Sequence, residues 1–177
     1  MSKVSELHKK SSPTSAGVYV LTCSTSKFEQ LKRKQRPDDE SGDIIERLAA
    51  DAGHKIVDRK LIADSKPMIR SALRAALASR KVDVFIVTGG TGLSQTDITF
   101  EAIYPLLERQ IPGFGEIFRR ISYDEIGSAA MMSRAFAGTV KGMAVFCLPG
   151  SPNAVRTAME RLILPELGHI IGLSRRT

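Results

Sequence analysis

Short apolar runs alternate with amphipathic stretches along most of the chain. Runs rich in β-forming residues predict strands, and they lie at 18–23, 55–62, 82–87, 139–141 and 143–148. Apolar residues at helical spacing predict helices around 44–52, 69–77, 103–107 and 155–167. This alternation predicts an α/β domain, a three-layer α/β/α sandwich with a mostly parallel sheet and right-handed crossovers.

Polar residues and prolines set the expected ends of these elements. A charged loop is expected over 27–40, and Ser41 is the expected N-cap of the first helix. The helix after the strand at 82–87 should begin near Thr96, and two short helices should occupy 113–137. Pro165 should kink the last helix.

Length and composition fit a single globular domain. The chain has 177 residues, of which 42% are hydrophobic and 25% are charged. Residues 1–16 are polar and are expected to form a flexible N-terminal tail, which leaves 17–177 as one α/β domain. Two cysteines form no disulfide framework, and no run is apolar enough for a membrane helix or a signal peptide. We therefore expect a cytoplasmic protein with no membrane partner.

The excess of positive charge lies near the start of the chain. The net charge is +7, and residues 1–36 alone carry eight Lys/Arg against two acids. The remainder is nearly neutral and lacks a basic face with interleaved aromatics, so no nucleic-acid partner is expected. Two interpretations of the basic segment 27–36 remain open: a solvated loop, or a loop that meets an anionic substrate.

A glycine turn follows the most apolar strand. Gly89, Gly90, Thr91 and Gly92 stand between that strand and a helix, where backbone N–H groups approach an anion without obstruction by a Cβ. The motif is neither a Walker A sequence nor GxGxxG. It is equally compatible with phosphate binding and with a tight strand-to-helix turn.

Two aspartates follow neighbouring predicted strands. Asp64 comes after the strand at 55–62, and Asp97 lies five residues past Gly92. Either residue alone is explained as a helix cap. If these strands are parallel neighbours, the two carboxylates emerge at the same edge of the sheet and should face one crevice. There they would hold Mg²⁺, which takes one or two carboxylates together with phosphate oxygens.

One further turn is a candidate for ligand binding, and several residue types that often carry out catalysis lack the pattern that catalysis requires. The turn Pro149-Gly150-Ser151-Pro152 brings another helix start to the same edge, as either a cap or an anion site. The three histidines lack metal-ligand spacing, and Cys23 and Cys147 end apolar strands as packing residues would. Without a nucleophile elbow, the chain favours chemistry that needs positioning and a metal, such as phosphoryl or nucleotidyl transfer.

The ordered set of motifs resembles the MoaB/Mog family of molybdenum cofactor biosynthesis proteins. The motifs are Ser41-Gly42, Asp64, Thr88–Gly92, Asp97-Ile98-Thr99, Pro112–Glu116, Ser133-Arg134 and Pro149–Pro152. The likeness runs from about Val18 to Gly172. Three positions depart from the family pattern, Lys27 for arginine, Ser65 for an acid and Phe100 for proline, and they place the chain nearer the MoaB branch.

The resemblance implies a function and a set of site residues. It implies Mg²⁺-ATP-dependent adenylylation of molybdopterin, giving adenylylated molybdopterin and pyrophosphate, by a homotrimer or homohexamer. The implied catalytic and metal-binding residues are Asp64 and Asp97. The implied substrate contacts are Ser24, Gly89, Gly90, Thr91, Gly92, Ser133, Pro149, Gly150 and Ser151.

Two other functions remain open on the sequence. One is a non-catalytic, molybdopterin-binding or scaffolding MoaB paralogue. The other is a nucleotide-processing relative similar to the competence-damage proteins, which usually carry an additional domain. The sequence leaves open whether molybdenum or tungsten is the eventual metal.

Overall fold

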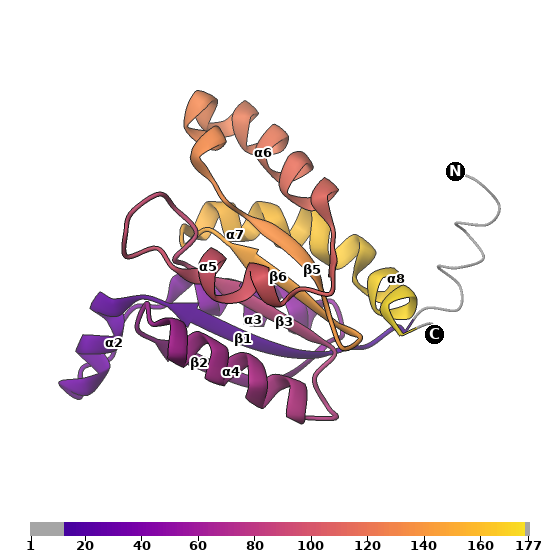
Figure 1. Cartoon of the computed structure of the whole chain (residues 1–177), viewed down its shortest axis with the longest axis horizontal. Helices are drawn as coiled ribbons and strands as arrows, with labels where there is room; N and C mark the ends of the chain where they lie inside the picture. The colour runs from indigo at the N-terminus through magenta and orange to yellow at the C-terminus, as the bar shows by residue number, and fades with distance from the viewer. Residues whose placement is uncertain (1–12, 176–177) are drawn as a thin grey trace.

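The structure, a computed structural model, describes residues 13–175 as a six-stranded sheet between two layers of helices (Figure 1). The strands run in the order β2-β1-β3-β6-β5-β4. Their bounds are β1 Gly17–Cys23, β2 Lys55–Ile62, β3 Val84–Thr88, β4 Arg109–Gln110, β5 Phe136–Val140 and β6 Met143–Leu148. The first four strands of the sheet are mutually parallel, and β5 runs antiparallel to both of its neighbours. The predicted three-layer, mostly parallel architecture is confirmed.

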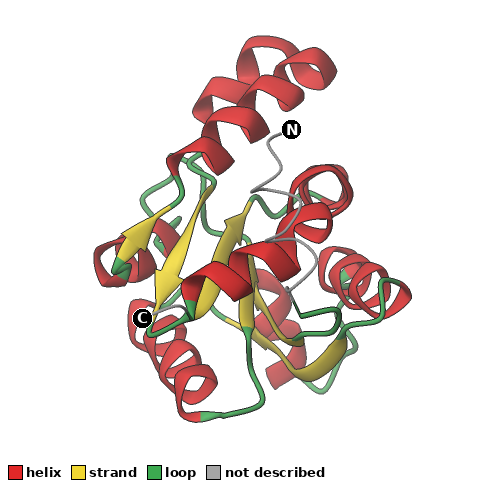
Figure 2. Ribbon diagram, turned by 90° about the vertical axis from the view of Figure 1, so that its right-hand side faces the viewer, coloured by secondary structure: helices red, strands yellow, loops and turns green. Residues whose placement is uncertain are grey.

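Helices cover both faces of the sheet (Figure 2). One face carries α3 (Glu40–Asp51), α6 (Pro112–Ile126), α7 (Pro152–Ala158) and α8 (Leu164–Ser174). The other face carries α4 (Lys66–Ala78) and α5 (Thr99–Ile103), while α2 (Thr25–Lys32) lies beyond the end of β1. The 3₁₀ helices η1 (Tyr104–Leu106) and η2 (Gly127–Met132) follow α5 and α6.

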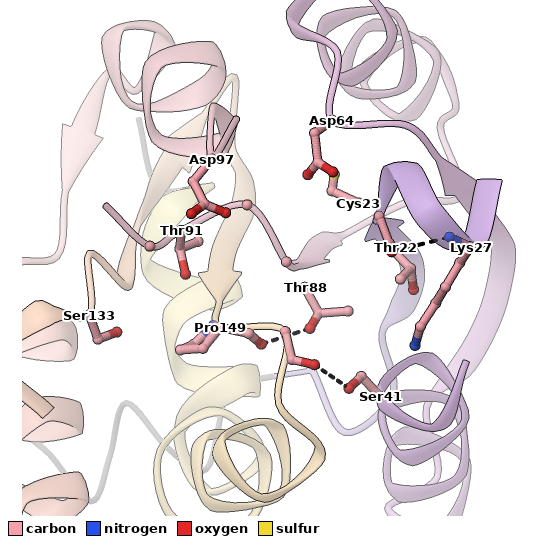
Figure 3. Close-up of a pocket in the computed structure, with 15 residues that line it drawn as sticks. Thr22, Cys23, Lys27, Ser41, Asp64, Thr88, Thr91, Asp97, Ser133 and Pro149 are labelled. Carbon is pink, nitrogen blue, oxygen red and sulfur yellow. Dashed lines mark hydrogen bonds between the residues drawn. The ribbon is translucent and has the colours of Figure 1, made fainter. Parts of the chain in front are cut away.

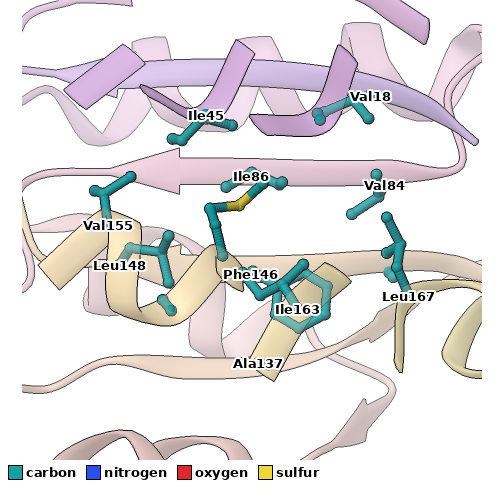
Figure 4. Packing of buried hydrophobic residues seen from close by; sticks show 14 of the residues in the cluster. Val18, Ile45, Val84, Ile86, Ala137, Phe146, Leu148, Val155, Ile163 and Leu167 are labelled. Carbon is teal, nitrogen blue, oxygen red and sulfur yellow. The ribbon is translucent and has the colours of Figure 1, made fainter. Parts of the chain in front are cut away.

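The central strands are almost wholly apolar because both of their faces are buried. Along β1, Val18 and Val20 pack under α3, while Tyr19 and Leu21 pack on the α4 side. Figure 4 shows the first of these two cores, in which Phe146 lies among side chains from strands and helices. The two cores hold the sheet between the helical layers. Because β1, β2, β3 and β6 are parallel, their carboxyl ends lie along a single edge of the sheet.

Three predicted element boundaries near the start of the domain are wrong. The charged loop expected over 27–40 contains the helix α2, which Ser24 caps by accepting from the Lys27 N–H. No residue of α2 is buried, so the apolar stripe by which helices are identified is missing. Asp39, and not Ser41, caps α3, because its carboxylate accepts from the Gly42 N–H. α5 begins at Thr99, later than expected.

The second half of the chain differs from the prediction in its helices. The two short helices expected over 113–137 are the 15-residue α6 and η2, and the strand predicted at 139–141 already begins at Phe136. Figure 1 shows α6 extending away from the sheet. The chain forms a π-helical turn, η3 (Met159–Ile163), directly before α8, which begins one residue ahead of Pro165, where the kink was expected.

The proposed tail is described only in part. Of the flexible tail expected over 1–16, residues 1–12 lie outside the described residues, and for them the tail remains a prediction. Ala16 is buried, and its N–H donates to His54 Nδ1 at 3.2 Å, while the Ser15 hydroxyl donates to the Gly53 carbonyl. Packed structure therefore already includes Ser15 and Ala16. Within 13–175, no helix is long and apolar enough to cross a membrane.

Candidate functional site

A cavity of about 410 Å³ opens at the carboxyl edge of the sheet, where β1, β2, β3 and β6 end (Figure 3). Its walls include ten of the eleven site residues that the sequence suggested. These are Ser24, Asp64, Gly89, Gly90, Thr91, Gly92, Asp97, Ser133, Pro149 and Gly150. The eleventh, Ser151, stands beside the cavity as the N-cap of α7. Residues spread over 127 positions of sequence thus form one site.

The glycine turn has a backbone shape that residues with a Cβ rarely adopt. Gly89 and Gly90 have φ values of +97° and +65°. A Cβ on Gly89 would lie 2.1 Å from the Cys23 carbonyl oxygen, and a Cβ on Gly90 would lie 2.5 Å from Thr99 Oγ1. Thr99 is held in place because its hydroxyl donates to the Gly89 carbonyl at 2.8 Å. The turn is therefore fixed against both β1 and α5.

The same turn leaves backbone donors at the cavity wall without a partner in the described part of the chain. The Gly89 N–H donates to the Leu148 carbonyl at 3.1 Å. The next three N–H groups, of Gly90, Thr91 and Gly92, have no hydrogen-bond acceptor within residues 13–175. Consecutive free amides at a glycine turn form a concave site for an anion such as phosphate. The interpretation of this turn as an anion site gains support from this arrangement.

Asp64 joins the end of β2 to the start of α2. Its Oδ2 accepts from both the N–H and the hydroxyl of Thr25, each at 2.9 Å. Its Oδ1 accepts no hydrogen bond from the described residues and would lie 3.1 Å from a Cβ on Gly90. One oxygen therefore orients the carboxylate while the other faces the glycine turn. Asp64 does not cap α4, whose N-cap is Ser65.

Asp97 stands in a short loop on the opposite wall of the cavity. Its Oδ2 accepts from the Ser94 N–H at 3.1 Å and would lie 2.8 Å from a Cβ on Gly92. Its Oδ1 accepts no hydrogen bond from residues 13–175. The side chain closes a local turn and is not the N-cap of α5, which is Ile98. Both capping explanations considered for the aspartates are therefore insufficient.

The donor set suits a hard cation that shares its coordination with a substrate. Two carboxylates, each with one oxygen free of protein hydrogen bonds, line the cavity. The described residues contain no cluster of three His, Cys, Asp or Glu side chains that would enclose a metal alone. Mg²⁺ is commonly bound by one or two carboxylates together with substrate phosphates. Asp64 and Asp97 fit that pattern.

Lys27 lines the cavity, although the sequence analysis noted it only as a departure from the family pattern and as part of the basic segment 27–36. Among residues 13–175 it is the one basic side chain that lines the cavity, and Figure 3 shows it extending from α2 toward Ser41. Its Nζ lies 4.0 Å from Oδ1 of Asp39, a buried carboxylate that also accepts from Arg59. The helix α2 places this amine at the cavity, so a loop prediction for 27–40 could not reveal it. Of the two interpretations of the basic segment, this position favours contact with an anionic substrate.

Two hydroxyls fix the Pro149–Ser151 turn against the cavity. Ser41 Oγ donates to the Gly150 carbonyl at 2.8 Å, and Thr88 Oγ1 donates to the Pro149 carbonyl at 2.8 Å (Figure 3). Ser41 therefore supports the site from α3, whereas its local sequence suggested a capping role and only the family resemblance included it among the motifs. Both bonds link elements far apart in the chain, which is why local sequence gave no sign of them.

The two cysteines behave as packing residues. Burial raises the pKa of Cys23 to about 12 and raises the pKa of Cys147 well above its usual value. Although Cys23 lines the cavity, its thiol therefore stays protonated near neutral pH and is a poor nucleophile.

The comparisons with known proteins agree with one another. Residues 19–169 match the family model described as a probable molybdopterin binding domain. The chain is 44% identical to molybdenum cofactor biosynthesis protein B of Bacillus cereus over 92% of this chain and 93% of that protein. It is 39% identical to a probable molybdopterin adenylyltransferase of Methanocaldococcus jannaschii, over 86% and 90% of the two chains. A crystal structure of a molybdenum cofactor biosynthesis protein B superposes with a TM-score of 0.85 at 43% identity, covering 93% of this chain and 99% of that one.

Proposed function

The chain belongs to the MoaB/Mog family of molybdenum cofactor biosynthesis proteins, and we propose that it is the nucleotidyltransferase that adenylylates molybdopterin with Mg²⁺-ATP. The observation that carries the proposal is the cavity itself. At one edge of the sheet it combines a glycine turn with free amides, one lysine, and two carboxylates that each have one oxygen free of protein hydrogen bonds. A relative at 39% identity is named for the same reaction.

The described residues are suited to binding two anionic substrates side by side. The amides of Gly90, Thr91 and Gly92 would hold phosphate oxygens, and Lys27 would add a positive charge. Ser24, Ser133 and the Pro149–Ser151 turn would contact the remaining parts of the substrates. These groups are fixed before substrates arrive, so binding energy is available for orientation.

The reaction requires no protein nucleophile. A terminal phosphate oxygen of molybdopterin would form a bond to the α-phosphorus of ATP, while the bond from that phosphorus to the bridging oxygen breaks and pyrophosphate leaves. Two anions must be held in line for this step, which is the task of the glycine turn and Lys27. Asp64 and Asp97 would hold Mg²⁺, which when bound supplies positive charge to the phosphate oxygens.

The assembly and location of the protein form part of the same proposal. We expect a homotrimer or homohexamer in the cytoplasm. Light scattering at micromolar concentration tests the assembly, and a monomer or simple dimer would contradict it.

The proposal is tested by incubating the full chain with molybdopterin, ATP and Mg²⁺. We expect adenylylated molybdopterin and pyrophosphate to form in equal amounts. Tight molybdopterin binding without product would contradict the proposal and support a scaffolding paralogue instead. Hydrolysis of a nucleotide without molybdopterin would support the nucleotide-processing alternative.

A further inference from the structure

The loop that carries Asp97 is held to the rest of the chain at few points. It runs from Gly92 to Ile98 between the glycine turn and α5, with no regular secondary structure. Inside the loop, Asp97 and Ser94 exchange two hydrogen bonds, at 2.9 and 3.1 Å. Leu93 at its tip is 68% exposed, so the loop lacks an apolar anchor there. These bonds hold Asp97 within the loop, so the position of the loop relative to the cavity must be fixed by contacts from outside it.

One residue from a distant segment supplies that constraint. Arg134 follows η2 and lies beside the loop. Its Nε donates to the Gly92 carbonyl at 2.8 Å, and its Nη2 donates to the Asp97 carbonyl at 2.9 Å. Its backbone N–H donates to the Thr91 carbonyl at 3.2 Å. Within residues 13–175, no other residue outside positions 89–102 makes a hydrogen bond to the segment 91–97.

The guanidinium is itself held at its other edge by α5. Its Nη1 pairs with the Glu101 carboxylate, and the group lies over the Phe100 ring at 5.2 Å from the centroid. The hydrogen bond from Arg134 lowers the pKa of Glu101, so the pair is charged at neutral pH. All three guanidinium nitrogens are therefore engaged, which a lysine ammonium cannot reproduce with one nitrogen.

The contacts of Arg134 leave the carboxylate of Asp97 available. The guanidinium binds the main-chain carbonyl of Asp97 and not its side chain. An ion pair with the carboxylate would compete with a cation, whereas a bond to the carbonyl fixes the backbone alone. This separation matches a residue that supports a ligand without neutralising it.

We propose that Arg134 is a positioning residue that fixes the Asp97 carboxylate at the cavity by binding the carbonyls at both ends of the Gly92–Asp97 loop. The inference rests on the proposed function, because it assumes that Asp97 holds the cation. Arg134 itself does not line the cavity.

The test is a double-mutant cycle on metal binding, independent of turnover. The dissociation constant of the complex of Mn²⁺ with α,β-methylene ATP, an unreactive analogue, is measured by electron paramagnetic resonance. The proteins are the wild type, Arg134→Lys, Asp97→Asn and the double variant, each checked by a thermal melt. Arg134→Gln replaces Arg134→Lys if the latter fails to fold. Glu101→Gln is the matched control, because it removes the ion pair and keeps both carbonyl contacts.

We expect Arg134→Lys to weaken binding about 10-fold or more, as loss of a supporting contact to a metal ligand does. The double variant should bind no more weakly than Asp97→Asn alone, because both changes act through one carboxylate. Glu101→Gln should stay within about twofold of the wild type.

Additive effects in the double variant would overturn the inference, as would wild-type affinity in Arg134→Lys. A wild type that does not bind the complex would overturn it too. A wild type that binds the complex but forms no adenylylated molybdopterin would overturn only the proposed function, and the cycle would still decide the role of Arg134.

Discussion

Substituting alanine for single glycines should separate the stability of the site from its chemistry. Gly90→Ala places a Cβ 2.5 Å from Thr99 Oγ1 at a φ of +65°. The left-handed conformation costs about 1–2 kcal/mol for a residue with a Cβ. Displacing the fully buried Thr99 from its bond to the Gly89 carbonyl costs about 1–3 kcal/mol more. We expect a loss of about 3 kcal/mol in the free energy of unfolding, which lowers Tm by roughly 6–12 °C.

Gly53→Ala and Gly113→Ala are matched controls for this cost. Gly53 has a φ of +83° and nothing within 4 Å of an added Cβ. Its alanine variant therefore measures only the cost of the left-handed backbone conformation. Gly113 has neither a positive φ nor a neighbour, and its alanine variant should be neutral or stabilising. If Gly90→Ala is no less stable than Gly53→Ala, the packing argument at the turn is wrong.

Gly92→Ala should impair turnover while leaving the stability of the fold nearly unchanged. Its Cβ would lie 2.8 Å from Asp97 Oδ2, which belongs to the end of a side chain that rotates away at small cost. We expect a change of less than about 1 kcal/mol in the free energy of unfolding together with a large loss of turnover, because the carboxylate is displaced. Thermal melts and the adenylylation assay measure the two effects on the same samples. A variant that melts normally and reacts normally would refute the assigned position of Asp97.

Three further predictions concern the start of the chain, Lys27 and pH. Deleting residues 1–12 should leave Tm unchanged. Deleting residues 1–16 should lower the free energy of unfolding, measured by chemical denaturation, by roughly 2–3 kcal/mol, because the contacts of Ser15 and Ala16 are lost. Equal stability of the two truncated proteins would show that these contacts contribute nothing. Lys27→Met should lower kcat/KM about 10–100-fold, and Lys27→Arg should keep part of the wild-type kcat/KM. Lys32→Met is the control, because it removes a lysine of α2 that is paired with Glu29, and it should leave kcat/KM unchanged. Equal losses in Lys27→Met and Lys32→Met would contradict a specific contact between Lys27 and the substrate. Because burial raises the pKa of Cys23 to about 12, the thiol stays protonated in the folded chain after it ionises in the unfolded one. The free energy of unfolding should therefore fall as pH rises from about 9 toward 12, and it should fall less steeply in Cys23→Ala. The same dependence of stability on pH in both proteins would contradict the raised pKa of Cys23.

The sequence was sufficient for the sheet and for most of the cavity wall. Buried parallel strands are apolar without interruption, so β1, β3 and β6 were predicted nearly to the residue. Parallel strands end at one edge, which correctly predicted that Asp64, Asp97 and the glycine turn would line one cavity. These inferences rest on local patterns combined with one topological rule.

The features that sequence reasoning missed depend on tertiary contacts or lack a periodic signal. The helix α2 has no buried residue, so only the cap at Ser24 could have revealed it. Ser41 reaches Gly150, and Arg134 reaches Gly92, across 109 and 42 positions of sequence. The antiparallel β5 was predicted too short because its first residues, from Phe136, fell within the helices expected over 113–137. The roles of the individual site residues remain predictions until variants are measured.

The central claim is that Asp64 and Asp97 hold the cation for nucleotidyl transfer, and the most direct measurement is turnover in two isosteric variants. Adenylylated molybdopterin formed per minute is compared for the wild type, Asp64→Asn and Asp97→Asn, with a thermal melt of each protein. Because asparagine retains the shape and hydrogen bonds but is a poor ligand for a hard cation, turnover should fall about 100-fold or more in both variants. The melts should stay close to that of the wild type, and molybdopterin binding should largely survive. Wild-type turnover in both variants would contradict the account.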